Sequence, residues 1–135
     1  MFKASILAIV SLIMIGCSTS LTATDERQRV ISHIKVEVSG KQAEDRPTMI
    51  SVCKGFALSE KQVLDFFAHA ASITEIDPNS RYNILPCYSS GTANINNEKY
   101  NWVIRSGGVG EFFSDKDKFI KICGKKCCSK VTNIC

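Results

Sequence analysis

Six cysteines in the last two thirds of this 135-residue chain limit what it can fold into more than any other feature. A seventh, Cys17, stands apart from them and follows Lys3 and an apolar run over residues 4–16. A positive start followed by a short apolar run is typical of an export signal, and disulfides persist in the compartments that such signals lead to. We therefore expect three disulfides and no bound metal among the six, with the pairing left open: Cys53, Cys87, Cys123, Cys127, Cys128 and Cys135.

The residues that end the apolar run, Met14-Ile15-Gly16-Cys17, resemble the lipobox of bacterial lipoprotein signal peptides. The run is shorter than the roughly 20 residues that a membrane-spanning helix needs. The resemblance implies a signal peptide over residues 1–16 and a diacylglycerol on the Cys17 sulfur. It also implies a place in the bacterial cell envelope, and Ser18, in place of the Asp that retains lipoproteins at the inner membrane, favours the outer membrane. An ordinary secretory signal and a retained anchor are the alternatives.

The cysteine count supports lipidation independently. An odd number of cysteines in an exported protein leaves a free thiol, and lipid on Cys17 removes the odd one. The run Cys123-x3-Cys127-Cys128-x6-Cys135 holds enough sulfur for a tetrahedral metal site, but it lacks paired C-x2-C units and a nearby His. Adjacent cysteines pair with each other only under strain, so we expect Cys127 and Cys128 to bond to different partners.

The chain divides by composition into a tether and one domain. Residues 17–29 are polar and small, which is typical of a flexible tether, and we expect residues 30–135 to form a single domain. The net charge is +4, and residues 116–135 hold six Lys against one Asp. This basic end is either a solvated tail or a patch for anionic lipid head groups or an acidic partner. Neither nucleic acid nor a cofactor is expected as a ligand in the envelope.

The clearest local signal predicts a helix over about residues 60–72. Ser59 with Gln62 three residues later forms a capping box. At 100° per residue, the polar side chains, His69 among them, fall on one side of the helix. The apolar side chains share the other side: Val63, Leu64, Phe66, Phe67, Ala70 and Ala71.

The rest of the chain is predicted to be strands and turns. Residues 34–38 alternate apolar and charged side chains, which predicts a half-buried strand, and the apolar run over 49–58 predicts a second strand. A turn is expected at residues 77–79. Further strands are predicted over 83–95, with a break at Pro86 or Gly91, and over 100–105, 109–113 and 118–123. We therefore expect an α+β fold with one amphipathic helix on an antiparallel β-meander, tied by disulfides.

Three stretches of the expected domain carry a second resemblance: Phe56-Ala57-Leu58-Ser59, Val63 to Ala70, and Pro86-Cys87-Tyr88-Ser89-Ser90-Gly91-Thr92. They are similar to a group of small exported bacterial proteins to which we attach no activity. The similarity spans roughly residues 53–127 and includes part of the late cysteine cluster. It implies a single domain and identifies no catalytic residues.

We expect no catalytic residues from the motifs either. Asp65 and His69 lie one helical turn apart, but Ser89 and Ser90 lie in no Gly-x-Ser-x-Gly elbow that would make either a nucleophile. The acidic residues are scattered near turns and offer no clear pair for glycoside hydrolysis. The glycine-rich run over 107–110 stands between strands, whereas a phosphate-binding loop leads into a helix.

Tyr88, Tyr100 and Trp102 are the candidate binding residues, because aromatic anchors dominate protein interfaces. Packing within the sheet is their alternative use. A small, disulfide-tied and membrane-tethered domain without a catalytic constellation favours a protein-binding lipoprotein, for example an inhibitor or immunity protein against an envelope-attacking enzyme. The first alternative is a structural or assembly component of the envelope or of a surface apparatus, and the second is a small hydrolase.

Lipidation is the first testable prediction. Cells expressing the protein should incorporate radiolabelled palmitate into it, and Cys17→Ala should abolish the label because the acceptor sulfur is gone. Ser18→Ala is the matched control, which should keep the label. Palmitate retained on the Cys17→Ala protein would show that the lipobox resemblance is misleading.

Overall fold

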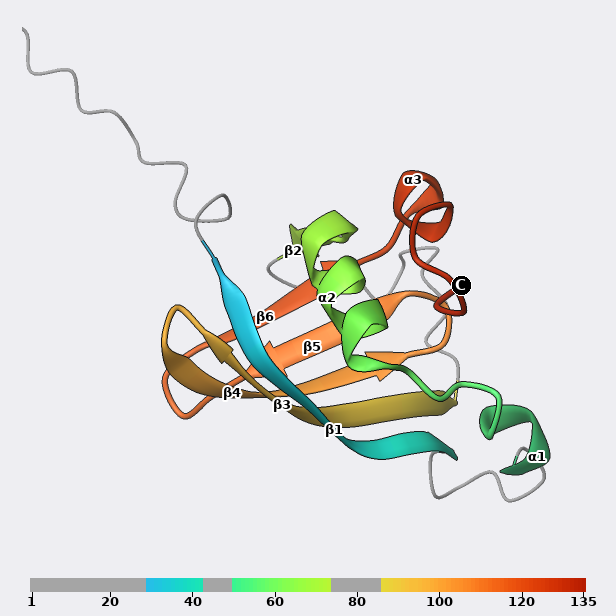
Figure 1. Cartoon of the computed structure of the whole chain (residues 1–135). Coiled ribbons are helices and arrows are strands. Elements are labelled where there is room, and N and C mark those ends of the chain that lie inside the picture. The colour runs from blue at the N-terminus through green and yellow to red at the C-terminus, as the bar shows by residue number, and fades with distance from the viewer. Residues whose placement is uncertain (1–28, 43–49, 74–85) are drawn as a thin grey trace, which may run out of the picture.

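The computed structural model describes residues 29–42, 50–73 and 86–135 (Figure 1). The expected signal peptide, Cys17 and all but the last residue of the expected tether lie outside these residues, as does the turn predicted at 77–79. Arg29, which ends the expected tether, already contacts the domain, since its guanidinium carbon lies 3.8 Å from the centroid of the Phe119 ring. Over the described ranges, no helix is long and apolar enough to cross a bilayer.

A six-stranded antiparallel sheet forms the body of the domain, in the order β1-β3-β4-β5-β6-β2. The fold is therefore α+β and disulfide-bonded. It departs from the expected simple meander, because β1 and β2 lie at opposite edges of the sheet (Figure 1). The strands are β1 (Ile31–Gln42), β2 (Ala71–Ile73), β3 (Cys87–Ile95), β4 (Glu98–Arg105), β5 (Val109–Phe113) and β6 (Lys118–Ile122).

Three helices accompany the sheet where one was expected: α1 (Ile50–Cys53), α2 (Glu60–His69) and α3 (Lys125–Cys128). The strand predicted over 49–58 is wrong, because its described part begins with α1 and continues as a turn and loop. An apolar run without a clear period fits a strand or a helix equally well. Here the conformation of the run follows from the disulfide at Cys53 and from the burial of Phe56 and Leu58.

Helix α2 lies across one face of the sheet (Figure 1) and supplies its apolar side to the core. Phe67 meets Phe112 of β5 edge to face at 5.2 Å between ring centroids, and Phe66 packs on the same ring at 6.4 Å. The helix ends at His69, earlier than expected, because residues 71–73 leave it to pair with β6 as β2. Exposed Leu64 lies outside the buried face.

Burial alternates along β3, β4 and the middle of β1. In β3 every second residue from Cys87 to Ile95 is buried. Of the two positions considered for a break, the strand runs through Gly91 and begins directly after Pro86. A Cβ at Gly91 would overlap the backbone of Lys35 in β1 and approach the Trp102 ring, so the glycine lets these strands lie close together. Asn96 and Asn97 both have positive φ, which matches the two-residue turn that joins tightly twisted strands.

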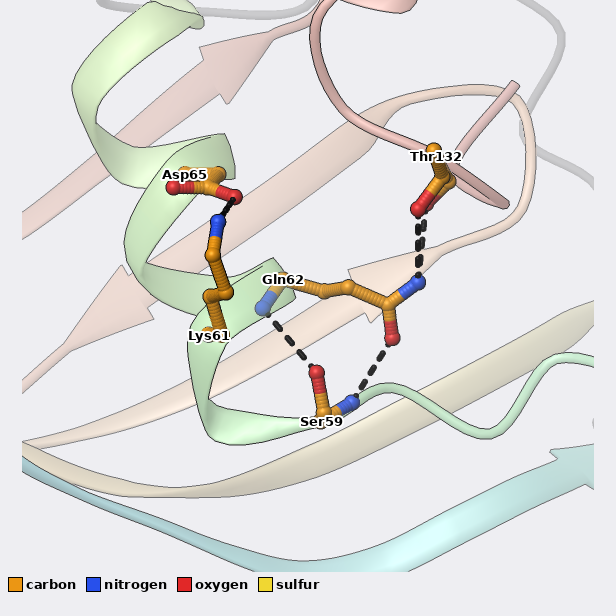
Figure 2. Close-up of polar contacts among 5 residues, drawn as sticks. All are labelled: Ser59, Lys61, Gln62, Asp65 and Thr132. Atoms are coloured by element: carbon orange, nitrogen blue, oxygen red, sulfur yellow. Dashed lines mark hydrogen bonds and ion pairs between the residues drawn. The ribbon is translucent and has the colours of Figure 1, made fainter.

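The start of α2 shows the predicted capping box (Figure 2). The Gln62 backbone N–H donates to the Ser59 hydroxyl at 3.2 Å, and the Ser59 N–H donates to Gln62 Oε1 at 2.9 Å. Gln62 Nε2 also donates to the Thr132 carbonyl oxygen at 3.0 Å. The same side chain therefore completes the helix start and holds the C-terminal segment against it.

This network predicts a measurable loss of stability. Ser59→Ala should lower the free energy of unfolding by about 1 kcal/mol, because a helix N–H loses its acceptor. Lys61→Ala is the matched control on the same turn and removes only the exposed pair with Asp65, which should cost less than about 0.5 kcal/mol. Urea unfolding of the three proteins measures both effects, and equal losses would contradict the role of the cap.

Candidate binding surface around the first helix

Helix α1 exposes two apolar side chains on either side of exposed Ser51, although the helix is firmly attached to the domain. Ile50 is 53% exposed and Val52 61%, while Cys53 is fully buried and bonded to Cys87 at the start of β3. Gly40 of β1 lies beneath the helix, with φ at +56°, and a Cβ there would stand 2.6 Å from the Cys53 carbonyl oxygen. The disulfide and this close approach fix the backbone of the helix that carries the two exposed side chains.

Two surface hollows adjoin α1. The first has a volume of about 370 Å³, and its lining includes Val52, Phe56, Cys87, Ser106, Ile134 and Cys135. The second has a volume of about 410 Å³, and its lining includes Ile50, Gly40, Lys41, Lys54 and Tyr88. Each hollow thus takes one wall from an exposed apolar side chain of the same helix turn. We call Ile50, Val52, Lys54 and Tyr88, with the two hollows, the α1 surface.

Of the three candidate aromatic residues, Tyr88 alone belongs to this surface. Tyr88 is half-buried, pairs with Lys41 in β1 and with Arg105 in β4, and its ring lies 5.8 Å from the Arg105 guanidinium carbon. Lys41 and Lys54, which line the same hollow, are both exposed. The hollow therefore combines an apolar wall and an aromatic ring with positive charge.

Tyr100 and Trp102 lie in the core, so the expectation that they bind a partner is corrected. Trp102 is fully buried, and its Nε1–H donates to the Thr92 carbonyl oxygen at 3.0 Å. Tyr100 is nearly as buried, and its hydroxyl donates to Asp117 at 3.0 Å. Alternation along β4 turns both side chains toward α2. They therefore serve the alternative role considered for them, which is packing in the core. Trp102→Ala would therefore test the fold and not the interface.

Two of the residues considered for a triad, Asp65 and Ser89, have other partners. Asp65 pairs with Lys61 one turn earlier. The buried Ser89 hydroxyl accepts from the Gly40 N–H at 3.2 Å and donates to the Phe56 carbonyl oxygen at 2.7 Å, so it ties β1 to the segment after α1. Gly107 and Gly108 adopt positive φ in the turn between β4 and β5.

All six downstream cysteines form disulfides: Cys53–Cys87, Cys123–Cys127 and Cys128–Cys135. Adjacent Cys127 and Cys128 bond to different partners, as expected.

The sequence did not point to the exposed side of α1, because Ile50 and Val52 were interpreted as part of an apolar strand. The one usable signal was a short apolar run ending at a cysteine.

Comparison with known proteins adds no assignment. A scan against protein-family models, a search of curated proteins and a search of solved structures found no match for this chain. The similarity to small exported bacterial proteins therefore stays a prediction.

Tyr100 generates a prediction about alkaline pH. Burial raises the pKa of its phenol above the ordinary value near 10, and the hydrogen bond to Asp117 and the charge of that carboxylate raise it further. Because the folded state holds this proton more tightly than the unfolded chain, the stabilisation is complete below about pH 10 and is lost as the pH rises through the folded-state pKa. Above about pH 10, the free energy of unfolding measured with urea should therefore fall less steeply with rising pH in Tyr100→Phe than in the wild type. Parallel curves for the two proteins would contradict the assignment.

Proposed function

We propose that the protein is a lipid-anchored, protein-binding module of the bacterial cell envelope and that its α1 surface contacts the partner. The observation that carries the proposal is the exposure of Ile50 and Val52 on a helix held by the Cys53–Cys87 disulfide. Exposed apolar side chains grouped beside hollows are typical of protein interaction sites. A surface held in one conformation also loses little entropy on binding, which favours affinity.

The form of the α1 surface supports a folded partner. Val52 and Ile50 stand between hollows of about 370 and 410 Å³, so the surface offers both projecting side chains and recesses. Lys41, Lys54 and Tyr88 around the second hollow suit a partner that inserts an apolar side chain flanked by acidic groups. An inhibitor or immunity protein against an envelope-attacking enzyme is the form of the proposal that we favour. The lipobox resemblance supports an anchor on Cys17, at the outer membrane.

Partner capture with single charged substitutions tests the proposal. The detergent-solubilised protein should retain a partner from envelope extracts, and Val52→Asp should lose it because the new carboxylate cannot be desolvated in an apolar interface. Leu64→Asp is the matched control, since Leu64 is a similarly exposed apolar residue, 45% exposed, on α2. It should retain the partner.

The outcomes separate the candidate functions. Mass spectrometry of the captured protein should identify an enzyme that attacks the envelope, whereas an assembly protein would favour a structural component. Capture that survives Val52→Asp in a folded protein would contradict the role of the α1 surface. His69→Ala should leave biological activity intact. If a folded His69→Ala protein lost that activity, the result would favour a small hydrolase. Thermal unfolding of each variant shows whether it is folded.

A further inference from the structure

Two disulfides lie against each other at the C-terminal end of the chain. Cys123–Cys127 joins the end of β6 to α3, and Cys128–Cys135 closes the C-terminal segment. The sulfur atoms of Cys123, Cys128 and Cys135 lie within 4.8 Å of one another, although Cys123 belongs to one bond and the other two to the second. Cys128 Sγ also lies 3.3 Å from the Cys123 carbonyl oxygen. A thiolate formed at Cys128 would thus stand beside the sulfur of Cys123.

The two bonds differ in access to solvent. Cys123 and Cys127 are only 5% and 4% exposed, whereas Cys128 is half-buried and Cys135 is exposed. Cys135 also lines the first hollow beside α1, which leads solvent to it. A dissolved thiol can therefore reach the Cys128–Cys135 bond directly, while the Cys123–Cys127 bond is covered.

We propose that these four cysteines form a thiol–disulfide relay, which takes an electron pair from an external dithiol at the exposed bond and passes it to the buried bond. One thiolate of the dithiol attacks Cys135 Sγ, forms a mixed disulfide and releases Cys128 as a thiolate. Cys128 Sγ then attacks Cys123 Sγ, forms a Cys123–Cys128 bond and releases Cys127 as a thiolate. The second thiol of the reagent displaces Cys135, so the dithiol leaves as a cyclic disulfide. Two electrons have moved, and Cys127 and Cys135 each end as a thiol.

The charges around the cluster favour the thiolates that these steps need. Lys125, Lys126 and Lys130 are exposed on the same segment, and no acidic residue occurs after Asp117. Positive charge near a cysteine stabilises its thiolate, and exchange rates depend on the thiolate fraction and on access. The lysines at the C-terminal end would therefore stabilise these thiolates as well as keep the surface soluble. The relay rests on the sulfur positions and is independent of the proposed partner.

Partial reduction of the wild-type protein tests the relay directly. The mature protein in detergent receives one equivalent of dithiothreitol, is quenched with acid, alkylated and digested with trypsin. Cleavage after Lys121, Lys125, Lys126 and Lys130 puts Cys123, the Cys127–Cys128 pair and Cys135 on separate peptides. Fragment ions then show which cysteine of the adjacent pair carries the alkyl group.

The expected product has alkyl groups on Cys127 and Cys135 and a Cys123–Cys128 link. Alkylation confined to Cys128 and Cys135, with Cys123–Cys127 intact, would overturn the relay, because it would show simple reduction of the exposed bond. Cys53 and Cys87 should stay unlabelled in the same sample, since their bond lies outside this group of sulfurs.

A double variant gives a second, kinetic test. Cys128→Ser with Cys135→Ser removes the entry point, so the Cys123–Cys127 bond should be reduced on the order of tenfold more slowly than in the wild type, since attack depends on access to the sulfur. Lys61→Ala, a substitution at an exposed residue of α2, is the control and should leave the rate unchanged. Equal or faster reduction in the first variant, with a wild-type circular dichroism spectrum, would overturn the relay. If that variant does not fold, the mapping on the wild-type protein decides alone.

Discussion

The packing of Trp102 against Gly91 is the contact on which the rest of the domain depends. The Trp102 ring is fully buried between α2 and the sheet, and a Cβ at Gly91 would stand 2.8 Å from its Cζ2 atom. The same missing side chain leaves space for the backbone of β1 at Lys35. Interiors are packed as densely as crystals, so a bulky ring is accommodated only where a neighbour is small. Gly110 does the same for the Phe66 ring of α2. These two glycines therefore set how closely β1 approaches β3 and how closely α2 approaches β5.

The C-terminal segment holds the end of the molecule around α1 in place. Gln62 donates to Thr132, Asn133 Nδ2 donates to the Gly55 carbonyl oxygen at 2.8 Å, and the Gly107 N–H donates to the Ile134 carbonyl oxygen at 3.0 Å. These bonds join the end of the chain to the start of α2, to the residues after α1 and to the turn after β4. The α1 surface is thus supported by a disulfide on one side and by the C-terminal segment on the other. Because Cys135 lines one of the hollows beside α1, the proposed relay and the proposed binding surface share an opening.

Local features of the chain predicted local structure well. The Ser59–Gln62 pair predicted the start of α2, since a capping box satisfies the first helix N–H groups wherever the helix lies. Period-two alternation predicted the half-buried strand over residues 34–38, which lies within β1, since successive residues of a strand point to opposite faces. The adjacent cysteines predicted that each bonds elsewhere, because their geometry strains a bond between them.

The sequence by itself thus determined the elements with a clear period or cap, because these follow from interactions between residues close in the chain. The order of those elements predicted the α+β class, and the even number of cysteines after Cys17 predicted disulfides. Only the tertiary structure decided that Trp102 and Tyr100 are core and Tyr88 is surface, that residues 50–53 form a helix with an exposed apolar side, and that β1 and β2 lie at opposite edges. It also decided that sulfurs from two disulfides lie within 4.8 Å of one another. Each of these outcomes depends on segments far apart in the chain. Burial, sheet order and the meeting of side chains across the fold are set by how those segments pack, and no short stretch of sequence encodes that packing.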